Sequence, residues 1–202
     1  MTLPRYPAYK DSGVEWLGKV PEHWTAAKLK WYASVFSGSD QKSDTGVVPL
    51  YGANGTIGEA EVASYTHSQT LIGRVGSAGS VNYAIDAYAV SDNALIVQNL
   101  QSVSSRFIYY WACLQDFSSE ISTTAQPLLT ASKVKDRRLT LPPQFEQISI
   151  AAFLDHETSK IDTLIAEGEH AVKLLQERRS ALISAAVTGK IDVRGLVPRE
   201  AA

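Results

Sequence analysis

The sequence predicts an α+β protein, with a β-rich domain over residues 1–143, one long helix over about residues 144–188 and a short tail to residue 202. Between residues 37 and 100, short apolar segments alternate with turn-forming residues, which is typical of strands joined by tight turns. After Pro142 and Pro143 the pattern changes, because no proline and only one glycine occur before Gly189. A segment with so few breaks predicts an almost uninterrupted helix.

The first strands and turns can be placed from local signals. Residues 6–24 predict an extended arm with turns at Ser12-Gly13 and Gly18, and residues 28–36 predict a short helix or strand. Asn54-Gly55 predicts a tight turn, because both residues tolerate positive φ. The segments LIGRVG, NALIVQ and RRLTLPP predict strands, and the last of them leads directly into the long helix.

A shorter helix is expected over residues 104–121, with Ser104 or Ser105 as its N-cap. Its apolar residues recur at a spacing that places them on one buried face: Phe107, Ile108, Trp111, Leu114 and Ile121. This helix would cover the core of the β-rich domain.

The ends of the long helix carry matching signals. Proline is favoured at the first helical position, and Glu146 in the first turn suits the positive end of the helix dipole. Gly189 is placed as the C-terminal cap.

Written as heptads, the long helix carries a wide apolar stripe and not a strict two-position seam. The residues expected to pair with another helix are Leu154, Ile161, Leu164, Leu175 and Leu182. About 45 residues extend for roughly 67 Å, whereas a domain of about 140 residues has a radius of gyration of roughly 14 Å. We therefore expect a partner helix. The alternative is a helix folded back over the β-rich domain, which the expected helix at 104–121 already covers.

Composition limits the classes of function. The chain has 202 residues, 45% of them hydrophobic and 20% charged, and a net charge of -2. Its one cysteine, Cys113, excludes an intramolecular disulfide. No apolar run approaches the roughly 18–20 residues that span a bilayer, and the first residues lack the layout of a signal peptide. We expect a cytoplasmic protein without a membrane partner.

The charge balance bears on nucleic-acid binding. Residues 1–143 contain 12 Lys and Arg and 12 Asp and Glu, whereas a protein that grips DNA alone usually has a basic excess. If this chain binds DNA, a partner is therefore expected to neutralise much of the phosphate charge. The basic segment KVKDRR, residues 133–138, is interpreted as a solvated turn or a phosphate contact.

No motif predicts catalysis, so we expect no catalytic residue. GRVGSAG lacks the GK[ST] ending of a phosphate-binding loop, and strand-like sequence follows it. A turn with exposed backbone, beside Arg74, is the better interpretation. The four histidines have no metal-ligand spacing, and no GxSxG nucleophile motif occurs. No metal site is expected either.

Polar side chains gather in the loops of residues 37–82 and 123–138. Arginine suits guanine, and asparagine or glutamine suits adenine, so these side chains are candidates for DNA contacts. The alternative for each one is a turn residue that satisfies its own backbone. The candidates are Gln41, Lys42, Tyr51, Asn54, Arg74, Ser77, Ser80, Asn82, Gln126 and Lys133.

Five segments, in order along the chain, carry a resemblance to a known family. They are YKDSGVEWLGKVPEHW, YGANGTIG, GRVGSAGSVNY, LPPQFEQISIAAFLD and KLLQERRSALISAAVTGKIDV. Together they resemble the DNA-specificity subunit of type I restriction–modification enzymes. The resemblance covers nearly the whole chain, and its most specific parts are the arm, the PPxxEQ entry to the helix and the ERRxxLIxxxVTGKID exit.

The resemblance implies a non-catalytic protein that directs others. A complete subunit of this family has two repeats, each a target-recognition domain followed by a long conserved-region helix. The two helices pack antiparallel, and each domain reads one half of a split site in double-stranded DNA. Methylation subunits, which bind S-adenosylmethionine, dock on this scaffold, and restriction/translocation subunits join them. The specificity subunit itself then needs no cofactor.

This sequence departs from the family layout, because it has one arm, one recognition region and one helix. It therefore resembles a half-subunit, natural or truncated. Two copies could pair their helices antiparallel as a homodimer and read a split palindrome, with helix length setting the gap between half-sites. The rival hypothesis is a coiled-coil scaffold whose β-rich domain binds a protein partner, which the near-neutral charge keeps open.

Overall fold

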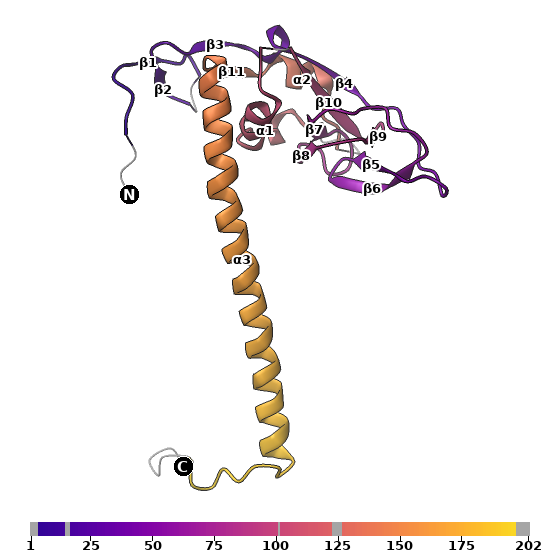
Figure 1. Cartoon of the computed structure of the whole chain (residues 1–202), viewed down its shortest axis with the longest axis vertical. Helices are drawn as coiled ribbons and strands as arrows, with labels where there is room; N and C mark the ends of the chain where they lie inside the picture. Colours follow the sequence, from indigo (N-terminus) through magenta and orange to yellow (C-terminus); the bar gives the residue numbers. More distant parts are fainter. Residues whose placement is uncertain (1–3, 15–16, 101, 123–126, 197–202) are drawn as a thin grey trace. The chain divides into compact units, whose positions relative to one another are not determined.

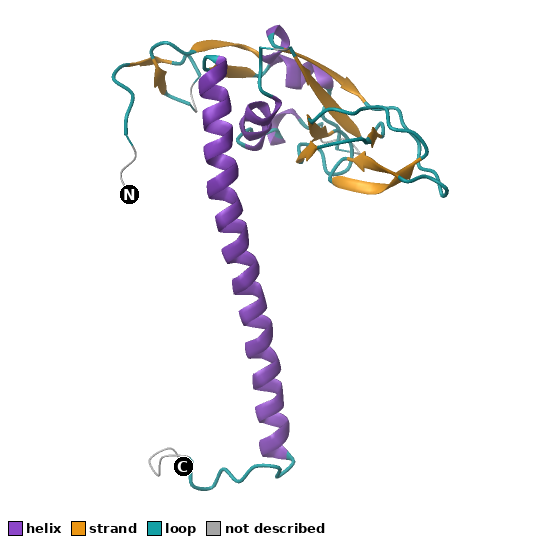
Figure 2. Ribbon diagram, viewed as in Figure 1, coloured by secondary structure: helices purple, strands orange, loops and turns teal. Residues whose placement is uncertain are grey.

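The structure is a computed structural model, and it describes residues 4–14, 17–100, 102–122 and 127–196. The chain divides into two compact units, Met1–Ala152 and Phe153–Ala202. Figure 1 labels the elements along the chain, and Figure 2 colours them as helix, strand or loop. The predicted class is confirmed, since a β-sheet domain is followed by a long helix.

An antiparallel sheet of four strands forms the centre of the first unit. Its order is β4 (Ala33–Ser37), β10 (Ala94–Asn99), β7 (Gln69–Gly73) and β8 (Val81–Ala84). The central strands β7 and β10 are covered on both faces, since all of β7, including the polar Gln69 and Thr70, and residues 94–97 of β10 are buried. Alternate residues point to opposite faces, so Ile72 joins one buried cluster and Leu71 joins another.

A second sheet contains the tight turn expected from the sequence. It consists of β5 (Val48–Gly52), β6 (Gly55–Ala60) and the short β9 (Ala89–Val90). Gly52 pairs with Gly55, which leaves Ala53 and Asn54 as a two-residue connection. Gly55 has φ +94°, a conformation that glycine adopts without strain. The turn predicted from Asn54-Gly55 is confirmed.

The helix expected over residues 104–121 is shorter than predicted. It is α1, Ser105–Cys113, and the Ser104 hydroxyl accepts a hydrogen bond from the Phe107 N–H at 3.3 Å, as an N-cap does. Phe107, Ile108 and Trp111 are buried as predicted, but Leu114 is exposed. After Leu114 the chain turns to bury Phe117 and then forms the 3-10 helix η2, Ser118–Glu120.

One further prediction needs correction, and another is confirmed. The segment 133–138 is not a solvated turn, because α2, Ala131–Asp136, takes up most of it and buries Val134 against the core. Residues 28–36 form both of the expected alternatives in sequence, the 3-10 helix η1 (Leu29–Trp31) and then β4.

The N-terminal arm is extended and hairpin-like. β1 (Tyr9–Asp11) pairs antiparallel with β2 (Lys19–Pro21), and Gly13 and Gly18 take positive φ at the turns between them. β3 (Thr25–Lys28) then pairs with β11 (Arg138–Leu141). This pairing joins the beginning of the chain to the strand that enters the long helix.

The long helix α3 spans Gln144–Val187, as the sequence predicts. Its end is also as expected, since Gly189 has φ +71° and the Lys190 N–H donates to the Ala185 carbonyl at 2.8 Å. This is the arrangement by which glycine closes a helix C-terminus. Residues 144–152 of α3 belong to the first unit and the remainder to the second.

Taken by itself, the second unit leaves its apolar stripe exposed. The exposed fractions of Ile161, Leu164, Leu175 and Leu182 are 54%, 65%, 63% and 53%. Leu154, at the beginning of this unit, is partly buried. The part of the chain that the structure describes contains no helix with the length and apolar character needed to cross a membrane.

The first turns of α3 are joined to the first unit by two neighbouring side chains, which we call the α3 junction (Glu146 and Gln147). The Glu146 carboxylate accepts hydrogen bonds from Tyr6 Oη at 3.1 Å, His23 Nε2 at 2.6 Å and Trp24 Nε1 at 3.0 Å. Gln147 is buried, and its Oε1 accepts from the Ser104 N–H while its Nε2 donates to the Pro142 carbonyl. The arm and α1 are therefore both attached to the same helical turn.

The charge state of Glu146 makes part of this attachment sensitive to acid. Burial raises the pKa of the Glu146 carboxyl, but the hydrogen bonds from His23, Trp24 and Tyr6 outweigh it and leave the pKa below its ordinary value. A carboxyl with a lowered pKa in the folded state contributes stability above its unfolded pKa and loses it as the pH falls through the folded value.

We predict that Glu146→Gln makes the stability of the chain less dependent on pH in the acid range. In the native chain, the contribution of Glu146 to the free energy of unfolding should begin to fall below about pH 4.3, the ordinary pKa of glutamate. Urea unfolding at several pH values measures it, with Glu59→Gln on the exposed edge of β6 as the control. Equal pH dependence in the native chain and Glu146→Gln would contradict the role of this carboxylate.

Candidate nucleic-acid interface

Three polar loops of the first unit meet at one end of the sheets, and we call them the loop surface (residues 53–54, 74–80 and 91–93). The Arg74 N–H donates to the Asn93 carbonyl at 2.8 Å, which joins the loop after β7 to the turn before β10. The Asn82 Nδ2 donates to the Ala53 carbonyl at 3.4 Å, which joins the β5–β6 turn to β8. The loops are therefore held as one surface.

Gly73 permits the closest approach between these loops. A Cβ at this position would lie 2.2 Å from the Ser77 carbonyl oxygen and 2.6 Å from that of Ala53. The loop after Gly73 also closes on itself, since the Gly73 N–H donates to the Ser80 carbonyl and the Gly79 N–H to the Gly73 carbonyl. GRVGSAG therefore forms a turn, as predicted, but the close approach at Gly73 is to the backbone of the protein itself. An approach of this turn to a ligand stays a prediction.

Five of the ten candidate DNA contacts lie on or beside the loop surface. Asn54 and Ser77 are exposed, whereas Arg74, Ser80 and Asn82 are partly exposed. Arg74 Nη1 donates to the Asp92 carbonyl at 3.0 Å, so one edge of the guanidinium is held by the protein. An arginine with one edge fixed is suited to present its other donors to a base or a phosphate.

The other candidates lie elsewhere or have packing roles. The Tyr51 ring packs edge-on against buried Tyr88, with centroids 5.7 Å apart. Gln41 and Lys42 are exposed in the loop after β4, where the Lys42 stem lies over Gly58 of β6.

Two candidates belong to the segment before and within α2. The Lys133 Nζ donates to the Glu120 carbonyl, which connects α2 to η2. Gln126 lies outside the described residues. Nevertheless, the neighbouring residues reach the loop surface, since the Leu129 N–H donates to the Arg74 carbonyl at 2.9 Å.

The structure adds a turn that the sequence interpretation passed over. Asp92 and Asn93 lie in the turn between β9 and β10, where Asp92 is exposed and Asn93 partly exposed. The Asp92 carbonyl accepts from both Ser37 Oγ and Arg74 Nη1. The sequence SDN signals a turn, but only the pairing of β10 with β7 shows that this turn lies beside Arg74.

A buried tyrosine, Tyr88, is bonded to the beginning of β7. The Tyr88 hydroxyl lies 2.9 Å from Gln69 Oε1 and 3.0 Å from the His67 carbonyl. Burial, reinforced by the neighbouring hydroxyls of Tyr65 and Tyr51, raises the pKa of Tyr88 well above its ordinary value. Its hydroxyl therefore stays protonated and acts as a structural hydrogen-bond donor.

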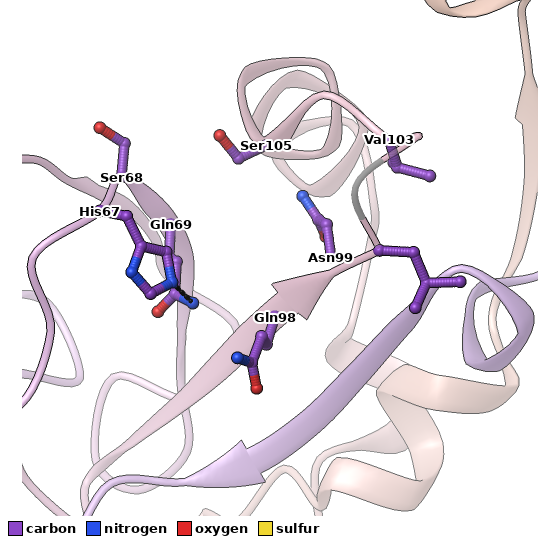
Figure 3. Close-up of a pocket in the computed structure, with 8 residues that line it drawn as sticks. His67, Ser68, Gln69, Gln98, Asn99, Val103 and Ser105 are labelled. Carbon is purple, nitrogen blue, oxygen red and sulfur yellow. Dashed lines mark hydrogen bonds between the residues drawn. The ribbon is translucent and has the colours of Figure 1, made fainter.

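A polar pocket of about 450 Å³ lies where β7 begins and β10 ends (Figure 3). His67, Ser68 and Gln69 line one side, and Gln98, Asn99 and Ser105 line another. The Asn99 amide is buried, and neither of its polar atoms has a hydrogen-bond partner among the described residues. Among the described residues, the lining contains no acidic side chain, lysine or arginine.

The loop surface and the pocket are separate places on the same sheet. Arg74 follows the last residue of β7 and the pocket contains the first, so about 16 Å of strand lies between them. Across the described residues, no group of three or more His, Cys, Asp or Glu side chains could hold a metal ion.

The family is shown by comparison with known proteins. The family model described as "Type I restriction modification DNA specificity domain" matches residues 32–171. This match includes the four-stranded and three-stranded sheets, α1, α2 and the first 28 of the 44 residues of α3. The chain therefore belongs to the type I restriction–modification DNA specificity family.

Curated relatives agree with this assignment. The chain is 25% identical over 158 residues to the type I restriction enzyme EcoprrI specificity subunit of Escherichia coli, which covers 78% of this chain and 38% of the relative. It is 27% identical over 121 residues to a putative type I restriction enzyme specificity subunit of Haemophilus influenzae, covering 57% of this chain and 31% of the relative. The chain thus spans about a third of the length of the curated relatives it matches.

Solved structures share the fold. A chain from work on complex assembly and conformational transition of the type I R-M system has a TM-score of 0.69 at 17% identity, covering 83% of this chain and 46% of that one. The type I S subunit from M. genitalium has a TM-score of 0.60 at 15% identity, covering 71% and 41%. The HsdS subunit from Thermoanaerobacter tengcongensis has a TM-score of 0.57 at 18% identity, covering 77% and 41%.

We predict that Gly73→Ala displaces the loop surface. The added methyl group would overlap two carbonyl oxygens, and overpacking of this kind costs about 1–3 kcal/mol. Thermal unfolding measures the loss, and amide NMR shifts of residues 74–80 locate it. The control is Gly168→Ala on α3, where a Cβ meets nothing within 4 Å and helix propensity improves by about 1 kcal/mol. Equal stability of the two variants would contradict the close approach.

Proposed function

We propose that this chain reads DNA sequence as the specificity component of a type I restriction–modification complex, and that two copies join through α3. The observation that carries the proposal is the exposed apolar stripe of the second unit, in a chain whose family is defined by DNA specificity. The loop surface supplies the polar groups that would read base edges. The stripe supplies the means to hold two such surfaces in one assembly.

The stripe has the properties of a helix-pairing surface. Four of the five residues predicted to pair are more than half exposed, and burial of an additional half of each side chain would stabilise the pair by about 1 kcal/mol per residue. A groove of about 450 Å³ runs along the same helix and is lined by Leu175, Arg178, Arg179, Leu182 and Ile183. Side chains from a second helix would fit a groove of this kind.

The symmetry of such a pair defines the DNA target. Two copies related by a two-fold axis present the same loop surface twice, so the target would be an inverted repeat split by a gap. α3 has 44 residues, which at 1.5 Å per residue is about 66 Å. An antiparallel pair of such helices would keep the two recognition domains apart, and its length would contribute to the gap.

Partners would provide the chemistry. Methylation subunits that bind S-adenosylmethionine would transfer the methyl group, and restriction/translocation subunits would join them. The chain would contribute sequence choice and assembly and would itself need no cofactor. Its near-neutral charge fits this division, because partners that close around the DNA would neutralise much of the phosphate charge.

The test is selection of DNA from a random pool by the chain assembled with its methylation subunits, followed by footprinting. We expect two protected half-sites in inverted orientation. Protection of no sequence would favour the rival hypothesis, in which the β-rich domain binds a protein.

We predict that Arg74→Ala relaxes the selected sequence at one base pair in each half-site. Loss of a guanine contact should cost about 1–3 kcal/mol of discrimination. Repeating the selection with this variant measures the change, and Arg194→Ala in the tail, outside the loop surface, is the control. Uniformly weaker binding would assign Arg74 to a phosphate, and unchanged selection would remove it from the interface.

We predict that Leu175→Asp abolishes pairing and leaves the recognition domain folded. The substitution places a charge in the apolar stripe, where desolvation costs several kcal/mol, on the order of 3–5. The control is Ala166→Asp, which introduces the same side chain on the opposite, exposed face of α3. Sedimentation analysis should give a monomer for the first variant and a dimer for the second. A dimer of Leu175→Asp would show that another surface mediates assembly.

A further inference from the structure

The α3 junction attaches one helical turn to two separate parts of the recognition domain. Glu146 contacts the arm through Tyr6, His23 and Trp24. Gln147 contacts the backbone at the beginning of α1 through the Ser104 N–H, at 2.8 Å. Successive residues on a helix project about 100° apart, so these two attachments act in different directions. Together they oppose both tilting and rotation of the first turn.

Each attachment is chemically specific. The Glu146 side chain is 14% exposed and accepts from donors on three side chains of the arm. Gln147 is 1% exposed, and both ends of its amide are used, since its Nε2 also donates to the Pro142 carbonyl at 2.9 Å. A buried amide satisfied at both ends favours one side-chain position over all others.

The chain entering the helix is stiff as well. β11 ends at Leu141 and α3 begins at Gln144, so two prolines are the whole connection. Proline fixes φ and restricts the residue before it. Ala151, two turns into the helix by its position, is also buried. The junction is thus fixed by backbone, hydrogen bonds and packing together.

We propose that Glu146 and Gln147 are positioning residues that determine which gap between DNA half-sites the assembled complex accepts. This inference rests on the proposed function. It adds a second determinant of the gap, the angle between α3 and the recognition domain, to the length of α3. A domain of about 150 residues has a radius of gyration of about 15 Å, so loops about 30 Å from the junction move by about 5 Å for a rotation of about 10°. That displacement is about one and a half base-pair steps of 3.4 Å.

The consequence is selectivity for spacing that is distinct from selectivity for bases. If the junction holds α3 in one direction in each copy, the loop surfaces of the two copies lie at one fixed separation. A junction that can rotate lets the same two surfaces reach a range of gaps, while each surface reads its own bases as before. The positioning residues touch no DNA in this proposal and act through the direction of the helix.

The experiment uses the chain assembled with its methylation subunits and a panel of duplexes. The duplexes carry the two selected half-sites at the preferred gap and at gaps shorter or longer by one to three base pairs, and one duplex carries a single half-site. The measured quantity is the ratio of affinity at the preferred gap to affinity at each altered gap.

The main variants are Gln147→Met and the pair Tyr6→Phe with Trp24→Phe. Methionine keeps the length of glutamine and loses both hydrogen bonds of the amide. The arm variants keep their aromatic rings and remove two of the three donors to Glu146, outside the buried cores. The arm pair therefore keeps the test informative if Gln147→Met does not fold. Ser149→Ala, whose hydroxyl contacts only its own helix at Phe145, is the matched control.

We expect each junction variant to reduce the ratio for altered gaps by about fivefold or more, the low end of coupling between sites in proteins. Affinity for the single half-site should stay at the native value, which a general loss of stability would not leave unchanged. In the same variants, spin labels at one exposed site of the recognition domain and one of α3 should give a broader distance distribution within a chain.

The outcomes separate the two proposals. If the native complex binds the split site with a sharp gap preference and folded junction variants keep that preference, the positioning role is wrong and the proposed function stands. If the native complex binds no split site, the proposed function fails and the positioning role fails with it. If a variant loses affinity for the single half-site in the same proportion, the junction is a folding element and not a determinant of the gap.

Discussion

The apolar stripe of α3 is the constraint on which the account of this protein depends. Side chains such as Leu164 and Leu175 are more than half exposed along a continuous helix of 44 residues. In proteins, a helix gains most of its stability from the packing of its apolar face against other elements. A helix of this length therefore carries an apolar surface that its own unit leaves uncovered, and the proposed cover is a second helix, which would fit its heptad spacing.

In the proposed pairing, the first unit would supply the surface that reads DNA. The backbone of Gly73 brings the loop after β7 against the β5–β6 turn, and the bonds of Arg74 to the 92–93 turn add a third loop. The loops after β7 and before β10 are held by strands that are largely buried on both faces, so their polar groups have a rigid support. Glu146 and Gln147 then connect the same unit to the first turn of α3. Recognition, junction and pairing surface follow one another along the chain.

Sequence reasoning succeeded where a local signal determines the local structure. The double proline and the absence of further breaks located α3, and Gly189 located its end, because a cap requires a residue that adopts positive φ. Asn54-Gly55 marked its hairpin for the same reason. The resemblance to specificity subunits was carried by the arm and the two ends of the helix, and the family match confirms it.

Sequence reasoning failed where residues distant in the sequence determine the end of an element or the partners of a side chain. Leu114 continues the helical spacing of α1, yet the helix ends at Cys113 because Phe117 is buried by a turn. Glu146 was expected to stabilise a helix dipole, whereas its partners Tyr6, His23 and Trp24 lie more than a hundred residues earlier. The individual DNA contacts stay predictions. The fold brings Asn54, Arg74 and Ser77 to one surface, but it does not identify which of them contact bases.

The most direct test of the central claim measures distances between two copies along α3. Single spin labels are placed on the exposed face opposite the stripe, at Ser159, Ala166 and Ser180, in a chain whose Cys113 is replaced by serine. In an antiparallel pair, moving the label by one residue away from the pairing centre lengthens the distance between copies by about 3 Å, twice the helical rise. The account predicts three distances that differ in this way. Equal distances at all three positions, or no distance between copies at tens of micromolar, would contradict it.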